Sequence, residues 1–331
     1  MGPVTLTHLP KRVPIARIVL AVGLVASPVT ACDRAKPTVA SSASVSAPTA
    51  PEVATPAPAL TTTASAVPPQ AGSSRPTAPA GSTTVTGRAS TVTGTVDRAT
   101  LTAYAQMADS AVAEVSERWK RTWPRRVVII APRDAAQFRE QVGRADDLGQ
   151  VAAITDGPIG PHGRATGDRI VLNPDAFARL TAEGRQFVLT HETTHVAVRS
   201  SLAGAAPLWL VEGYADHVGY SGSDRSRTDL AASLLERVRS GKGPTRLPTQ
   251  GDFDPAQGEI APTYLGAWLA VDLIASRYGE GTLRRFYEAS TVTDSSAAAD
   301  TATDRAFVDV LGTTRAAFTK SWLAELDRLA G

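Results

Sequence analysis

Several residue types are scarce in this sequence, and each shortage narrows the kind of protein it can be. The 331 residues include a single cysteine, Cys32, so no internal disulfide can form. Charge is nearly balanced, with a formal net charge of +2, and no basic stretch interleaved with aromatic residues occurs. The chain therefore lacks the electrostatic footprint of a nucleic-acid-binding protein, and we expect it to bind no nucleic acid. Histidine is rare as well, with five in the chain.

The N-terminus has the pattern of an export signal. Residues 1–31 carry three basic residues and no acidic one, and their apolar run from Ile18 to Ala26 is too short for a comfortable membrane span. Val29-Thr30-Ala31-Cys32 then resembles the bacterial lipobox, in which small residues precede a cysteine that receives lipid. We predict a lipoprotein signal peptide at 1–31 and a lipid on Cys32 that anchors the protein to the extracytoplasmic face of the cell membrane. An ordinary cleaved signal or an uncleaved anchor are the alternatives.

The next segment, residues 32–96, is dominated by Ala, Ser, Thr and Pro. Between Lys36 and Arg88 only Glu52 and Arg75 carry charge. Such a composition cannot bury enough apolar surface to offset the entropy of ordering the chain. We therefore predict a disordered tether that holds the following domain away from the membrane.

Residues 97–331 show mixed helical and strand periodicity and are expected to form one domain. Strands come early and helices later, which predicts the α+β class, with a small mixed sheet packed on one long helix and a mainly helical C-terminal lobe. The expected strands cover 126–131, 151–155 and 169–172. The expected helices cover 101–123, 135–142, 184–200, 208–219, 228–239, 262–277, 282–289, 303–310 and 314–329.

The segment His191-Glu192-Thr193-Thr194-His195 carries the clearest chemical signal. Residues four apart lie on one face of a helix, so His191 and His195 can bind one metal ion together. Glu192, offset around the same helix, can reach a water bound to that metal. A helix with two structurally satisfied histidines is the alternative.

A catalytic zinc usually takes three protein ligands and leaves one position for water. Glu212 lies seventeen residues beyond His195, far enough for a turn and a second helix to return it to the metal. Asp216 falls one helical turn after Glu212, where it could accept a hydrogen bond from the outer nitrogen of a ligand histidine. The alternative for both acids is a solvated helix face.

Together, the 191–195 motif and the segment Pro207-Leu208-Trp209-Leu210-Val211-Glu212-Gly213-Tyr214-Ala215 resemble the gluzincin peptidases, in particular bacterial peptidase-MA-like domains. The similarity extends over roughly residues 100–330 and is carried mainly by these two motifs. It implies a zincin-like fold that binds one Zn²⁺ per chain through His191, His195 and Glu212. It also implies that Glu192 is the general base.

The tetrahedral oxyanion of amide hydrolysis needs a hydrogen-bond donor beyond the metal. Tyr264 is the first candidate, because related enzymes use a tyrosine on the helix after the third ligand. His217 is the second, because it is the only other histidine near the motifs. For both residues, core packing or surface exposure is the alternative.

These observations predict a lipid-anchored zinc metallopeptidase, expected to be a monomer, that hydrolyses peptide or protein substrates. The same features leave two alternatives. One is a non-catalytic binding lipoprotein that keeps zinc as a structural element, although Glu192 would then have no purpose. The other is a zinc-dependent hydrolase of a non-peptide amide, since the same chemistry would serve.

Overall fold

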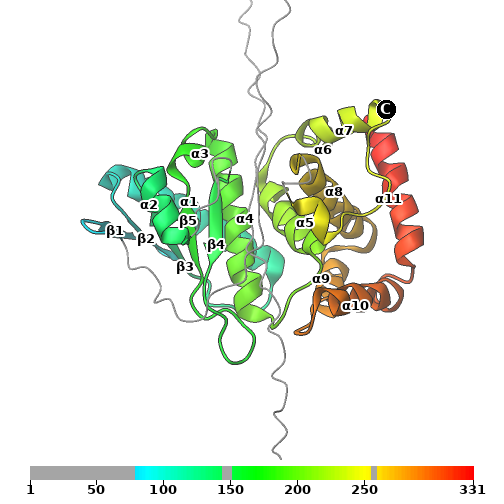
Figure 1. The fold of residues 1–331 in the computed structure, drawn as a ribbon, viewed down its shortest axis with the longest axis horizontal. Helices are drawn as coiled ribbons and strands as arrows, with labels where there is room; N and C mark the ends of the chain where they lie inside the picture. The colour runs from blue at the N-terminus through cyan, green and yellow to red at the C-terminus, as the bar shows by residue number, and fades with distance from the viewer. Residues whose placement is uncertain (1–78, 144–150, 255–258) are drawn as a thin grey trace, which may run out of the picture.

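A computed structural model describes residues 79–143, 151–254 and 259–331 (Figure 1). The predicted export signal, the lipidation site at Cys32 and most of the predicted tether lie outside these residues. In the part of the chain that is described, no helix is long and apolar enough to cross a membrane.

The N-terminal half is built on a five-stranded mixed sheet of order β1-β2-β3-β5-β4. Its central strands β2, β3 and β5 are parallel, whereas β1 and β4 run antiparallel at the two edges. In chain order the strands are β1 Thr83–Thr86, β2 Ser90–Gly94, β3 Val127–Ala131, β4 Ala153–Asp156 and β5 Arg169–Leu172. The edge strand β4 matters most for the site, because it lies against the helix that carries the 191–195 motif.

The assignment of residues 32–96 to a tether is wrong at its C-terminal end, because β1 and β2 belong to the folded domain. Both strands alternate Thr with Val, which suits a pleated and half-buried surface. Val92 is fully buried, and β2 pairs along its whole length with β3. The Asp109 carboxylate also accepts hydrogen bonds from the backbone N–H groups of Arg88 and Ala89 and so fastens the β1-β2 turn to the next helix.

Helices cover both faces of the sheet. The long helices α1 (Arg98–Trp119) and α4 (Ala182–Ser201) lie on one face and pack against each other, while α2 (Ala135–Val142) lies on the opposite face. Alternation along β3 explains this, since Ile129 faces the large core and Ile130 the small core beneath α2. The short helix α3 (Pro174–Ala178) leads into α4.

The C-terminal half is helical, and its central helices α5 and α8 pack against each other beside α4 (Figure 1). Gly213 permits this close crossing, because a Cβ there would lie 2.4 Å from the carbonyl oxygen of Ala267. The elements are α5 Leu208–Gly219, η1 Tyr220–Gly222, α6 Arg227–Leu230, α7 Ala232–Arg239, η2 Gln250–Phe253, α8 Ala261–Tyr278, α9 Glu280–Ala289, α10 Ser296–Asp309 and α11 Arg315–Ala330.

The predicted α+β class, with a small mixed sheet followed by a helical half, is confirmed. Three helix predictions need correction. The predicted helix 101–123 ends at Trp119, because Lys120 adopts a left-handed backbone conformation. The predicted helix 228–239 is divided into α6 and α7, and the predicted helix 303–310 begins earlier, at Ser296, where the Ser295 side chain accepts a hydrogen bond from the N–H of Ala298.

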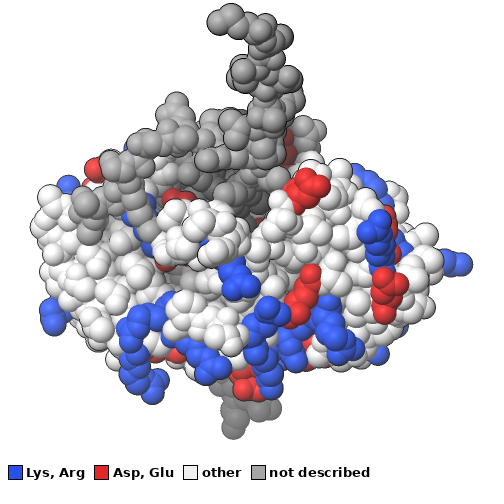
Figure 2. Space-filling model, turned by 90° about the horizontal axis from the view of Figure 1, so that it is seen from below, with Lys and Arg blue, Asp and Glu red and all other residues white. Residues whose placement is uncertain are grey.

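Charged side chains of both signs share the surface. On the face seen in Figure 2, Lys and Arg side chains lie among Asp and Glu side chains. Ion pairs join Arg118 to Glu114 at 2.9 Å and Arg121 to Glu288 at 2.8 Å. Acidic neighbours thus offset these two basic groups.

Candidate metal centre

Helix α4 places the motif in the interior of the molecule. It begins at the cap residue Thr181, whose side chain accepts a hydrogen bond from the N–H of Gly184. From there it runs between α1, α5 and the edge strand β4. Every side chain from Phe187 to Val198 is buried as a result, including both histidines and the glutamate of the motif.

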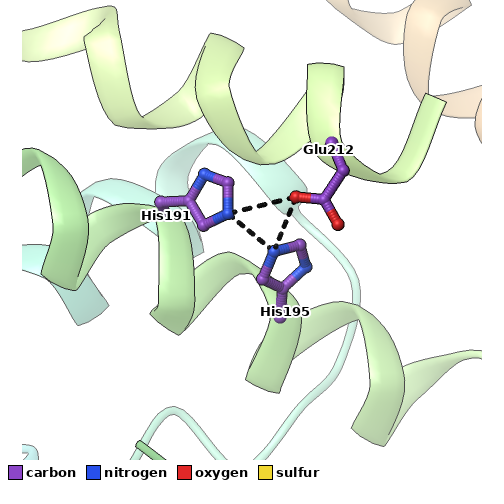
Figure 3. Close-up of side chains that lie close together, drawn as sticks. All are labelled: His191, His195 and Glu212. Carbon is purple, nitrogen blue, oxygen red and sulfur yellow. Dashed lines mark hydrogen bonds and ion pairs between the residues drawn. The ribbon is translucent and has the colours of Figure 1, made fainter. Parts of the chain in front are cut away.

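Three side chains converge at this point, two from α4 and one from α5 (Figure 3). The Nε2 atoms of His191 and His195 lie 2.8 Å apart. Oε2 of Glu212 lies 3.4 Å from Nε2 of His191 and 3.7 Å from Nε2 of His195. All three residues are buried, and their ligand atoms lie within 4.8 Å of one another.

This arrangement fits a metal ion. Ligand atoms about 2.0–2.1 Å from a tetrahedral zinc are separated by about 3.3 Å, close to the distances that Glu212 makes. Apart from the two imidazole rings, neither carboxylate oxygen of Glu212 has a hydrogen-bond partner among the described residues. A buried carboxylate in that situation is costly unless a cation compensates it. The cluster of His191, His195 and Glu212 could therefore hold a metal ion.

Asp216 makes the contact with His191 that its spacing predicts. Its Oδ1 lies 2.8 Å from Nδ1 of His191, and both side chains are buried. A proton on Nδ1 donates to this carboxylate, which orients the ring so that Nε2 faces the cluster. Asp216 is thus a support for His191.

Asp216→Asn is expected to weaken the affinity of the cluster for zinc by about 10- to 100-fold, because the amide is a poorer acceptor for the His191 ring. Competition with a chromophoric chelator measures this affinity. Asp272→Asn on α8 is the matched control, since its carboxylate pairs with His217 and Arg227 instead. Equal zinc affinity in the Asp216 variant and wild type would count against a supporting role.

Burial and charge set the protonation of the cluster. Burial favours the neutral ring of His191, but hydrogen bonds to Asp216 and Glu212 outweigh it and raise the pKa to about 10. Burial raises the pKa of Glu212 to about 7. Burial, with the adjacent His191, lowers the pKa of His195 well below its ordinary value. A metal ion that binds in the cluster must displace the proton on Nε2 of His191, the ring nitrogen that faces Glu212 and His195.

Glu192 lies next to the cluster and contacts the edge strand of the sheet. Its side chain is fully buried, and the hydroxyl of Thr155 on β4 lies 2.5 Å from its Oε2. The second oxygen, Oε1, has no hydrogen-bond partner among the described residues. Burial raises the pKa of this carboxyl, while the charge of His191 and hydrogen bonds from Thr155 oppose the rise. Sequence reasoning did not find Thr155, because nothing in the strand 151–155 distinguishes it.

Tyr264 lies on α8 in the neighbourhood of the cluster. It is 5% exposed, and its ring packs edge-on against Phe253 with centroids 5.1 Å apart. Burial raises the pKa of its phenol, and the negative charges of Glu212, Asp216 and Glu192 raise it further. The phenol therefore stays protonated at neutral pH and remains a candidate donor.

His217 does not belong to the cluster, and its interpretation as an oxyanion donor is corrected. Its Nε2 lies 2.9 Å from Glu280 and its Nδ1 lies 3.4 Å from Asp272, so carboxylates occupy both ring nitrogens. Burial opposes the charged ring, but these two partners prevail and raise the pKa to about 9. Five residues correspond to about 140° around a helix, which turns His217 away from the face that carries Glu212.

No protein-family model matches this chain, and no curated protein matches its sequence. The function of the site therefore has to be inferred from its own geometry and chemistry.

Proposed function

We propose that the protein is a zinc metallopeptidase of the gluzincin type, and that the cluster of His191, His195 and Glu212 holds the zinc. The observation that carries this proposal is the convergence of three buried ligand atoms beside Glu192. A purely structural zinc site has no need for a buried carboxylate at that position. A hydrolytic site needs one, because an attacking water must lose a proton.

The residues around the cluster have complementary roles in this proposal. When bound, zinc would supply Lewis-acid chemistry, polarising a carbonyl and acidifying a water. Glu192 accepts the proton of the attacking water and returns it to the leaving nitrogen. Tyr264 donates a hydrogen bond to the oxyanion that develops on the substrate. Asp216 keeps the His191 ring in its ligating orientation.

The N-terminal sequence also indicates where in the cell the protein would act. A lipid on Cys32 would anchor the chain at the extracytoplasmic face of the cell membrane. This part rests on the pattern of residues 1–32 alone, which lie outside the described structure. Its substrates are then peptides or proteins on the extracytoplasmic side of the membrane.

A peptide-library assay on the zinc-loaded protein tests the proposal. We expect cleavage that a zinc chelator abolishes and that added Zn²⁺ restores, with new peptide termini identified by mass spectrometry. Bound zinc without cleavage of any library member would favour the alternative of a non-catalytic binding lipoprotein. Zinc-dependent hydrolysis confined to small non-peptide amides would favour the alternative of a hydrolase that acts on such amides.

A further inference from the structure

The side chain of Thr155 joins the edge strand β4 to Glu192. This threonine is 1% exposed, and its Oγ1 lies 2.5 Å from the carboxylate Oε2 and 3.1 Å from the backbone carbonyl oxygen of Glu192. A hydroxyl has one proton to donate. The shorter distance is typical of a hydroxyl that donates to a carboxylate, so we assign the proton to Oε2.

This contact makes the two oxygens of Glu192 unequal. Oε2 is held by Thr155, whereas Oε1 has no hydrogen-bond partner among the described residues. An oxygen without a protein partner is the one able to accept a proton from water. The hydroxyl thus leaves one defined oxygen for proton transfer and fixes the plane of the carboxylate.

Thr155 is itself held by the sheet. It lies inside β4, where it pairs with Ile170 of β5, and β5 pairs in turn with β3. A strand within a sheet is a more rigid support than a loop, and a flexible glutamate gains precision from such a contact. The Thr155 hydroxyl therefore connects the Glu192 carboxylate to the β-sheet.

We propose that Thr155 is a positioning residue that holds the Glu192 carboxylate in the orientation needed for proton transfer. The proposal rests on the proposed hydrolytic function and extends it to a residue outside both sequence motifs. Thr155 acts through Glu192 and touches neither the metal ligands nor the substrate in this role.

The test compares Thr155→Val, which removes the hydroxyl at nearly constant shape, with Thr155→Ser, which keeps it. We expect the valine variant to lose about 10- to 100-fold in kcat, as expected for the loss of one hydrogen bond to a charged group, with KM and zinc content unchanged. The serine variant should recover most of kcat. Thr303→Val is the matched control, because Thr303 is equally buried but donates to the Ala299 carbonyl within α10.

Full kcat in Thr155→Val would overturn the proposal, and so would a loss that serine does not recover. If the valine variant fails to fold, Thr155→Ala replaces it, with the serine variant again as the reference. These results bear on Thr155 only when the wild type hydrolyses its substrate.

If the wild type hydrolyses nothing, the proposed function fails, and a double-mutant cycle on urea midpoints then judges the contact. Midpoint shifts of Thr155→Val and of Glu192→Met, which removes the carboxylate acceptor at similar volume, that do not add would support a positioned Glu192. Additive shifts would overturn it.

Discussion

Glu192→Gln is expected to lower kcat by about 10²- to 10⁴-fold while the fold and the zinc content stay as in wild type. The amide has nearly the same shape as the carboxylate, and its oxygen can still accept a hydrogen bond from the hydroxyl of Thr155. It cannot take a proton from water, however, so the step that generates the nucleophile is lost. Steady-state kinetics on a cleaved peptide, together with metal analysis, measure both parts of the prediction.

Glu183→Gln is the matched control for this experiment, because it is an exposed glutamate in the first turn of the same helix. It should leave kcat unchanged. Wild-type turnover in the Glu192 variant would show that another group acts as the base. Loss of zinc from that variant would instead show that Glu192 belongs to the metal shell.

Glu212→Gln is expected to separate metal binding from stability. Removing the negative ligand should weaken zinc affinity by more than about 100-fold, since changing a residue that merely supports a ligand already costs 10- to 100-fold. The metal-free variant, however, should be at least as stable as metal-free wild type. Burial raises the pKa of the Glu212 carboxyl to about 7 even with His191 beside it, so the folded metal-free protein disfavours this negative charge, and the uncharged amide avoids that cost.

Urea unfolding with and without zinc measures this difference. Zinc at about 1,000 times its dissociation constant should stabilise wild type by about 4 kcal/mol and the Glu212 variant far less. Glu236→Gln, an exposed glutamate on α7, is the control and should keep the full stabilisation. A Glu212 variant that zinc stabilises as strongly as wild type would remove Glu212 from the ligand set.

The parts of the fold and site that depend on local pattern could be predicted. The strand at 169–172 and the helices around the two motifs follow from periodicity and capping, and the 191–195 spacing directly gives two side chains on one face. Glu212 could be predicted because the 191–195 motif requires a third ligand, and the seventeen residues after His195 leave room for a turn and a second helix. Gly213, next to it, marks the close crossing of α5 with α8.

The features that could not be predicted from the sequence depend on contacts between segments that are distant along the chain. The strand β2 is ordered by pairing with β3 and by the Asp109 carboxylate, and neither contact can be seen in a Thr/Val-rich stretch. Thr155 acquires its importance only because β4 lies against α4. The prediction for His217 was wrong for a related reason, since closeness in sequence to Glu212 does not place the two side chains on the same face of α5.

The most direct test of the metal centre is a crystal structure of the zinc-loaded protein with anomalous data collected at the zinc absorption edge. We predict one anomalous peak, about 2.0–2.2 Å from Nε2 of His191, Nε2 of His195 and a carboxylate oxygen of Glu212. A zinc-loaded protein whose only peak lies elsewhere, or whose Glu212 is turned away from the ion, would contradict it.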